Sequence, residues 1–266
     1  MLQNKVTLLI FSCDKFSDLW DGHVKLLEKN WPDRNMVTYI VTDKDTNKHY
    51  QNVGILSAGK DTEFTDRVAF ALSKVQTEFV FITLDDYFLT KKISTKAIYR
   101  LVEIMETEQI DYLRLYLRSK RSNREQIKDY KGVFAVDTSF RYSVNLYPGI
   151  WKKDFMLKTV VQRKNPWQYE VSLPRLAREN NAKCAMSNNK EFEILDVVRK
   201  GKILNRANRY LTRHNIYNGD RPVQSRWYEF KLCIQTMGSR LLPTWMFNKL
   251  RGFLIKRGYH FYSQDE

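Results

Sequence analysis

The chain has 266 residues, 43% of them hydrophobic and 14% aromatic, which is enough to bury a sizeable core and excludes wholesale disorder. Its 45 Lys and Arg residues exceed its 30 Asp and Glu residues, and the formal net charge of +15 favours anionic partners: nucleotide phosphates, nucleic acid or an acidic membrane surface. The three cysteines lie far apart in sequence, so they suggest neither a disulfide framework nor a zinc-ligand pair, and a reducing cytosol fits them.

The first half of the chain alternates between apolar strands and amphipathic helices. The predicted elements, in chain order, are a strand over 5–14, a helix over 18–31, strands over 36–43 and 52–58, a helix over 64–76 and a strand that begins at residue 79. Continuous apolar strands separated by such helices indicate a mostly parallel sheet that is covered on both faces. We therefore expect an α/β fold.

Polar side chains follow three of the predicted strands. In chain order they are Ser12, Cys13 and Asp14, then Thr42 and Asp43, then Asp85 and Asp86. Ligands of open α/β sheets bind beyond the carboxyl ends of the strands, so this convergence predicts a binding site there. Polar residues are also common where ordinary loops begin. Neither a GxGxxG segment nor a GxxxxGK[ST] segment is present to cradle phosphates.

Asp85 and Asp86 stand side by side after the apolar run FVFITL. Two adjacent carboxylates raise each other's pKa unless a cation or a hydrogen-bond donor lies beside them. A solvated turn would also accept two aspartates. A Mg²⁺ or Mn²⁺ ion bound by Asp85 and Asp86 would account for the pair. Because hard cations prefer oxygen ligands, this ion would also supply the missing counter-charge for nucleotide phosphates.

A first strand that ends in Ser and Asp, a second that ends in Asp and a later one that ends in LDDYF resemble bacterial GT-A-type glycosyltransferases, especially those of capsule and O-antigen polysaccharide biosynthesis. The segments 143–156 and 165–173 are similar to the acceptor-side strand and the aromatic-acidic segment of these enzymes, and the resemblance spans residues 5 to 200. Tyr87 stands where the usual Asp-any-Asp metal motif has its second acid, so strict metal dependence does not follow.

The resemblance implies a GT-A-like, Rossmann-type fold, with a mixed, mostly parallel sheet flanked by helices, and transfer of a sugar from a nucleotide-sugar. UDP-sugars are the expected donors, with galactofuranose and galactose among the candidate sugars. The expected acceptor is a saccharide or a polyprenyl-pyrophosphate-linked saccharide. The residues expected to bind the donor are Ser12, Asp14, Asp43, Asp66, Arg67 and Asp85.

The segment NPWQYE contains the candidate catalytic base. Asn165 is a predicted N-cap, a proline follows it and Gln168 completes a capping box, so Glu170 lies early in a helix. An inverting transfer needs one base for the acceptor hydroxyl, and an apolar neighbourhood would raise the pKa of Glu170 towards a useful value. The alternative is a first-turn Glu that is stabilised by the helix dipole. Asp154 and Glu179 are weaker candidates in charged surroundings.

Aromatic residues near that helix are the candidate acceptor contacts. Trp151 follows a glycine turn, and Trp167 and Tyr169 flank the helix start near Glu170, so each could offer a flat ring to a sugar. A core position suits Trp151 equally well. The basic stretch 118–132 is a candidate lid or acceptor-phosphate contact, or else an ordinary solvated loop.

The chain changes character in its last part, which divides it into a catalytic domain over 1–205 and a basic tail over 206–266. Between Arg221 and Tyr262 eight Lys or Arg residues accompany one acid, and apolar residues at helical spacing predict two amphipathic helices broken by Pro243. Adsorption on an anionic membrane surface would use both the charge and the apolar stripe. Packing on the catalytic domain would use the stripe alone.

No apolar run reaches the ~18 residues that span a membrane, and the first residues do not form a signal peptide. We therefore expect a cytoplasmic protein, peripheral at the inner face of the cell membrane. Two function classes remain: an inverting glycosyltransferase and a basic nucleic-acid-binding protein. The second rests only on charge and aromatic content, since no nucleic-acid-binding signature is visible and acids at the strand ends repel phosphates. Nucleic acid is therefore not an expected partner.

Overall fold

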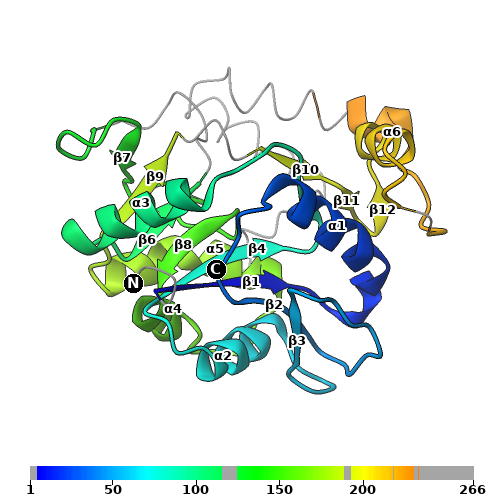
Figure 1. The fold of residues 1–266 in the computed structure, drawn as a ribbon. Helices are drawn as coiled ribbons and strands as arrows, with labels where there is room; N and C mark the ends of the chain where they lie inside the picture. The colour runs from blue at the N-terminus through cyan, green and yellow to red at the C-terminus, as the bar shows by residue number, and fades with distance from the viewer. Residues whose placement is uncertain (1–4, 116–124, 189–192, 218, 231–232, 234–266) are drawn as a thin grey trace, which may run out of the picture. The chain divides into compact units, whose positions relative to one another are not determined.

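The computed structural model describes residues 5–115, 125–188, 193–217, 219–230 and 233. The chain divides into two compact units, Met1–Leu195 and Asp196–Glu266, and each is described by itself (Figure 1). The division lies earlier in the chain than the boundary after residue 205 that composition suggested.

The first unit is built on an eight-stranded mixed sheet with the strand order β3-β2-β1-β4-β8-β6-β9-β7. The strands are β1 (Val6–Phe11), β2 (Thr38–Thr42), β3 (Gly54–Ser57), β4 (Phe79–Leu84), β6 (Tyr112–Arg114), β7 (Val133–Ala135), β8 (Gly149–Lys152) and β9 (Cys184–Ser187). β7 and β8 pair antiparallel with their neighbours, and the other pairings are parallel. The predicted mixed, mostly parallel sheet is confirmed.

Helices cover both faces of this sheet (Figure 1). They are the 3₁₀ helix η2 (Asp14–Leu19), α1 (Trp20–Asn30), α2 (Phe64–Lys74), α3 (Thr95–Thr107), α4 (Lys153–Thr159) and α5 (Pro166–Glu179). Val6, Leu8 and Ile10 of β1 pack in one core with α1 and α3, whereas Leu9 and Phe11 pack in a second core with α2, α4 and α5. Because both faces of β1 are buried, its sequence is a continuous apolar run.

The central strands end where the sequence turns acidic. β4 ends at Leu84, so the apolar strand stops at the acidic pair as predicted, and Asp85 and Asp86 form a turn. β5 (Tyr87–Leu89) then leaves the main sheet and pairs with β10 (Ile194–Asp196) in a two-stranded sheet. The acidic pair therefore stands at the carboxyl edge of the main sheet.

The second unit is described in part. It holds a hairpin of β11 (Val198–Arg199) and β12 (Lys202–Ile203), then α6 (Asn205–Arg213), and residues 226–230 are helical. The predicted amphipathic helices over 221–262 lie mostly outside the described residues, as do residues 118–124 of the predicted lid.

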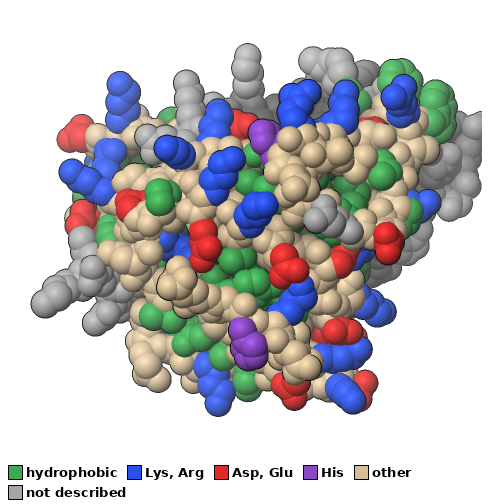
Figure 2. All heavy atoms as spheres, turned by 45° about the vertical axis from the view of Figure 1, so that its right-hand side comes forward, with side chains coloured by type: hydrophobic (Ala, Val, Ile, Leu, Met, Phe, Trp, Pro, Cys, Tyr) green, Lys and Arg blue, Asp and Glu red, His purple; other side chains and the backbone are tan. Residues whose placement is uncertain are grey.

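Charged side chains of both signs share the face of the molecule that Figure 2 shows. Figure 2 shows basic and acidic side chains interspersed over the visible face, with small apolar areas between them. Within the described residues, no helix combines the length and the apolar character needed to cross a bilayer.

Candidate functional site

Asp85 lies beside the end of β1 and is held from three sides. Its backbone N–H donates to the carbonyl oxygen of Phe11 at 3.1 Å, which extends the β1–β4 pairing by one residue. Its carboxylate Oδ2 accepts a hydrogen bond from the hydroxyl of Ser12, and its carbonyl oxygen lies 3.1 Å from Nδ1 of His23. Asp85 is therefore buried in fixed surroundings, whereas the neighbouring Asp86 is half-buried.

The hydroxyl of Ser12 has a different use from the one expected. It accepts a hydrogen bond from Nε1 of Trp20 at 2.7 Å and donates one to the carboxylate of Asp85. We expected Ser12 to bind the donor, but both of these hydrogen bonds are made within the protein. Sequence reasoning missed Trp20 and His23, which lie three residues apart on α1. A histidine on an otherwise apolar helix face was the available signal.

A hydrogen bond between Asp14 and Asp43 joins the residues that follow β1 and β2. Asp43 Oδ1 accepts from the backbone N–H of Asp14 at 2.7 Å and from the hydroxyl of Thr42 at 3.3 Å. The carboxylate of Asp14 in turn pairs with Nζ of Lys44 at 2.8 Å, and this contact raises the pKa of Lys44. Asp14 and Asp43 thus lie together at the sheet edge, as the sequence predicted.

Cys13 lies between Ser12 and Asp14 at this edge. Burial raises the pKa of the Cys13 thiol, the charges of Asp85 and Asp43 raise it further, and the charge of Arg67 lowers it. Arg67 projects from α2 and is itself buried. Its Nη1 donates to the carbonyl oxygen of Thr62 at 2.7 Å, and its buried Nε has no hydrogen-bond partner among the described residues.

A hydrogen bond to the loop before β8 holds Glu170 at the same edge of the sheet. Oε1 of Glu170 accepts a hydrogen bond from the backbone N–H of Leu146 at 3.2 Å. The next residue, Tyr147, stacks on Tyr87 with ring centroids 5.2 Å apart and an interplanar angle of 13°. Since Tyr87 directly follows the acidic turn and β8 runs antiparallel to β4, the Glu170 carboxylate and that turn belong to one end of the sheet.

The helix start before Glu170 is as predicted. The Asn165 side chain accepts from the backbone N–H of Gln168 at 3.0 Å, and Gln168 reaches back to the N–H of Asn165 at 3.3 Å. This reciprocal capping box fixes the first turn of α5. Of the weaker base candidates, Glu179 pairs with Arg175 on the exposed side of α5 at 2.7 Å.

Two of the three predicted acceptor contacts are wrong. Trp151 and Tyr169 are 0% exposed. Trp151 stacks on Phe155 in the core, and the hydroxyl of Tyr169 hydrogen-bonds that of Thr159 at 2.6 Å. Both side chains lack any surface to offer a sugar, and Tyr169 does not desolvate Glu170 as we expected, because it turns to the core. Trp167, in contrast, is 56% exposed.

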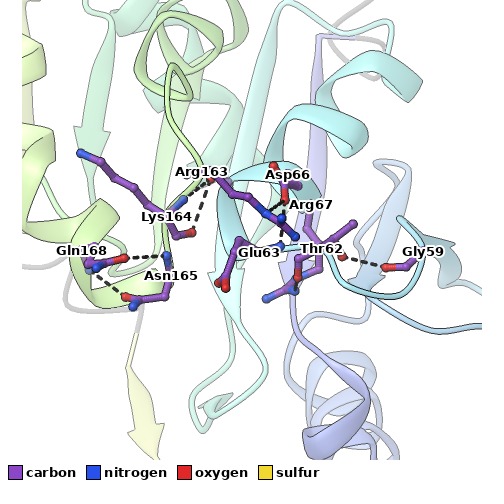
Figure 3. Close-up of polar contacts among 10 residues, drawn as sticks. Gly59, Thr62, Glu63, Asp66, Arg67, Arg163, Lys164, Asn165 and Gln168 are labelled. Carbon is purple, nitrogen blue, oxygen red and sulfur yellow. Dashed lines mark hydrogen bonds and ion pairs between the residues drawn. The ribbon is translucent and has the colours of Figure 1, made fainter.

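The side chain of Asp66 is part of the capping box at the start of α2. Its Oδ2 accepts from the backbone N–H of Glu63 at 2.9 Å and from Nε of Arg163 at 2.9 Å (Figure 3). A polar pocket of 430 Å³ lies between the starts of α2 and α5. Its lining residues are Asp61, Thr62, Glu63, Arg163, Asn165 and Gln168. The expected donor contact of Asp66 is thus replaced by a helix cap and an ion pair.

Comparison with solved structures identifies the architecture. The S. aureus TarS 1–349 structure in complex with UDP-GlcNAc, a GT-A-type glycosyltransferase, aligns with a TM-score of 0.51 and 14% identity over 75% of this chain and 60% of that chain. The chain has a GT-A-like fold. It spans less than two thirds of the TarS chain.

Two further likenesses are weaker. A second crystal structure of S. aureus TarS 1–349 aligns with a TM-score of 0.47 and 12% identity, over 71% of this chain and 59% of that chain. The bifunctional IspDF of Campylobacter jejuni aligns with a TM-score of 0.42 and 17% identity, over 72% and 52%. No protein-family model matches the chain, and no curated protein matches its sequence.

Proposed function

We propose that the chain is a glycosyltransferase that uses a nucleotide-sugar donor. The observation that carries this proposal is the meeting of Asp14, Asp43 and the acidic turn at the carboxyl edge of a GT-A-like sheet. Arg67, on the helix α2 that packs against β1 and β2, adds a buried guanidinium. Ligands of open α/β sheets bind at that edge. Carboxylates suit ribose hydroxyls, and a guanidinium suits phosphate oxygens.

The donor that we propose is a UDP-sugar. Its support is the TarS complex, which contains UDP-GlcNAc and shares this fold at a TM-score of 0.51. Galactofuranose and galactose, which the sequence resemblance suggested, are further candidates for the sugar. In this arrangement Asp43 holds the ribose and Arg67 holds the diphosphate.

The site suits a divalent cation that is brought with the donor. Among the described residues no group of three His, Cys, Asp or Glu side chains is arranged to hold a metal ion. Mg²⁺ commonly takes one or two carboxylates from a protein and its other ligands from phosphates and water, so such a group is not required. Asp86 would hold the ion, with Asp85 beside it. Once bound, the ion would offset negative charge on the departing diphosphate.

Glu170 is the proposed base of an inverting single displacement. Its carboxylate takes the proton of the acceptor hydroxyl while the hydroxyl oxygen bonds to the anomeric carbon and the bond from that carbon to the diphosphate breaks. The contact with the Leu146 N–H holds the carboxylate at the sheet edge. Trp167 precedes Glu170 by three residues, on the neighbouring face of α5, and is exposed enough to stack on an acceptor sugar.

The acceptor that we propose is a saccharide carried on a polyprenyl pyrophosphate at an anionic membrane surface. The support comes from the described part of the second unit. Exposed Arg206, Arg209 and Arg213 form a stripe at helical spacing along α6. Trp227, 73% exposed, pairs with exposed Phe230 in the helical residues 226–230. Basic and aromatic side chains together favour interfacial binding.

A thermal-shift screen tests the function directly. We expect UDP with Mn²⁺ to raise the melting temperature more than GDP, CDP or dTDP does, because a ligand of the folded state stabilises it by mass action. Asp86→Asn should lose the Mn²⁺-dependent part of this shift and abolish sugar transfer, while Glu103→Gln, which changes an exposed acid on α3, should behave as wild type. Full transfer in EDTA would refute the metal role, and no shift with any nucleotide would refute the proposal.

A further inference from the structure

A buried chain of hydrogen bonds links a helix to the acidic turn across two strands. Trp20 Nε1 donates to Ser12 Oγ at 2.7 Å, and Ser12 Oγ donates to Asp85 Oδ2. We propose that Trp20 is a positioning residue, which fixes the Asp85 carboxylate for donor binding by acting through Ser12. This inference rests on the proposed function. It assigns Trp20 and Ser12 to orienting the site.

The chemistry of the three groups sets the direction of the chain. An indole N–H can only donate, so it occupies a lone pair of the Ser12 oxygen. The hydroxyl proton then has two acceptors within reach, the Asp85 carboxylate and, at 3.3 Å, the Cys13 carbonyl oxygen. The carboxylate is the stronger acceptor because it carries charge. Trp20 holds the hydroxyl oxygen in place, and from that position its proton points to Asp85.

Burial makes this arrangement hard to replace by water. Trp20, Ser12 and Asp85 are all buried. The Asp85 backbone is held by the Phe11 carbonyl oxygen and by His23. The Ser12 hydrogen bond in addition restricts the orientation of the carboxylate. Because a buried hydrogen bond to a charged group is strong, its loss should be measurable in donor affinity.

The chain offers a matched control for Trp20. Trp31, at the other end of α1, is 2% exposed against 1% for Trp20, and its Nε1 donates to the hydroxyl of Thr95 at 2.8 Å. Trp20→Phe and Trp31→Phe therefore each remove an indole N–H that donates to a hydroxyl group, and both indoles are equally buried. Both variants should lower the melting temperature. Only Trp20→Phe changes the surroundings of the acidic turn.

The experiment measures the Kd for UDP-GlcNAc and for UDP, with Mn²⁺, by calorimetry below both melting temperatures. We expect Trp20→Phe to weaken binding by up to about tenfold, which corresponds to the loss of the hydrogen bond that holds the Ser12 hydroxyl beside Asp85, and Trp31→Phe to leave the Kd unchanged. Equal Kd values for Trp20→Phe and wild type would overturn the inference. Wild-type protein that binds neither probe would overturn the proposed function and the inference with it.

A double-mutant cycle distinguishes a positioning role of Trp20 from a general loosening of the core. Its Ser12→Ala arm also tests the inference if Trp20→Phe folds poorly. Ser12→Ala alone should weaken binding at least as much as Trp20→Phe. In the Ser12→Ala background, Trp20→Phe should cause no further loss, since the indole acts only through the hydroxyl. Additive losses, or a Ser12→Ala variant with wild-type affinity, would show that Trp20 is only a core residue.

Discussion

His23 makes the stability of this protein sensitive to mild acid. The pKa of His23 is lowered from 6.5 to about 4, chiefly by burial, with the hydrogen bond to the Asp85 carbonyl oxygen opposing this change and the charge of Arg34 adding to it. In the unfolded chain the histidine takes up a proton near its ordinary pKa. Below that pH the unfolded state therefore binds a proton that the folded state does not bind, and folding becomes less favourable.

The size of the effect follows from the shift. A difference of about 2.5 pH units at about 1.4 kcal/mol per unit predicts that His23 lowers the free energy of unfolding by about 3 kcal/mol as the pH falls from about 6.5 to about 4. No further loss from His23 is expected below that range.

Urea denaturation at several pH values measures this dependence. His23→Gln cannot gain a proton, so its free energy of unfolding should fall about 3 kcal/mol less than that of wild type between pH 6.5 and pH 4. His49→Gln, which changes an exposed histidine, should keep the wild-type dependence. A His23→Gln variant with the wild-type dependence would refute the assignment of a neutral, buried His23.

Three further predictions concern the proposed chemistry. Glu170→Gln should keep donor binding and lower kcat by ~10²–10⁴-fold in a transfer assay, whereas Glu179→Gln on the same helix should not; a product with retained anomeric configuration would contradict the mechanism. Asp43→Ala should raise the donor KM more than it lowers kcat, and unchanged donor affinity would count against its role. A chain that ends at residue 218 should lose liposome binding yet bind nucleotide; if it unfolds, the removed segment belongs to the core.

The elements themselves could be predicted because their signals are local. A strand buried on both faces must be apolar along its whole length, so β1 and β4 were readable, as was the break at Asp85 and Asp86. The capping box of Asn165 and Gln168 was readable for the same reason, since its two partners lie three residues apart.

The sequence alone also determined that acids gather at one edge of the sheet, since the carboxyl ends of parallel strands meet there. Only the tertiary structure decided which side chains face that edge. Trp151 and Tyr169 lie in segments that reach the site, yet both are core residues, because their side chains turn to the face that α2, α4 and α5 cover. The partner of Ser12 is 73 residues away in the chain. A hydrogen bond between such distant residues depends on strand order and register, and no local pattern encodes either.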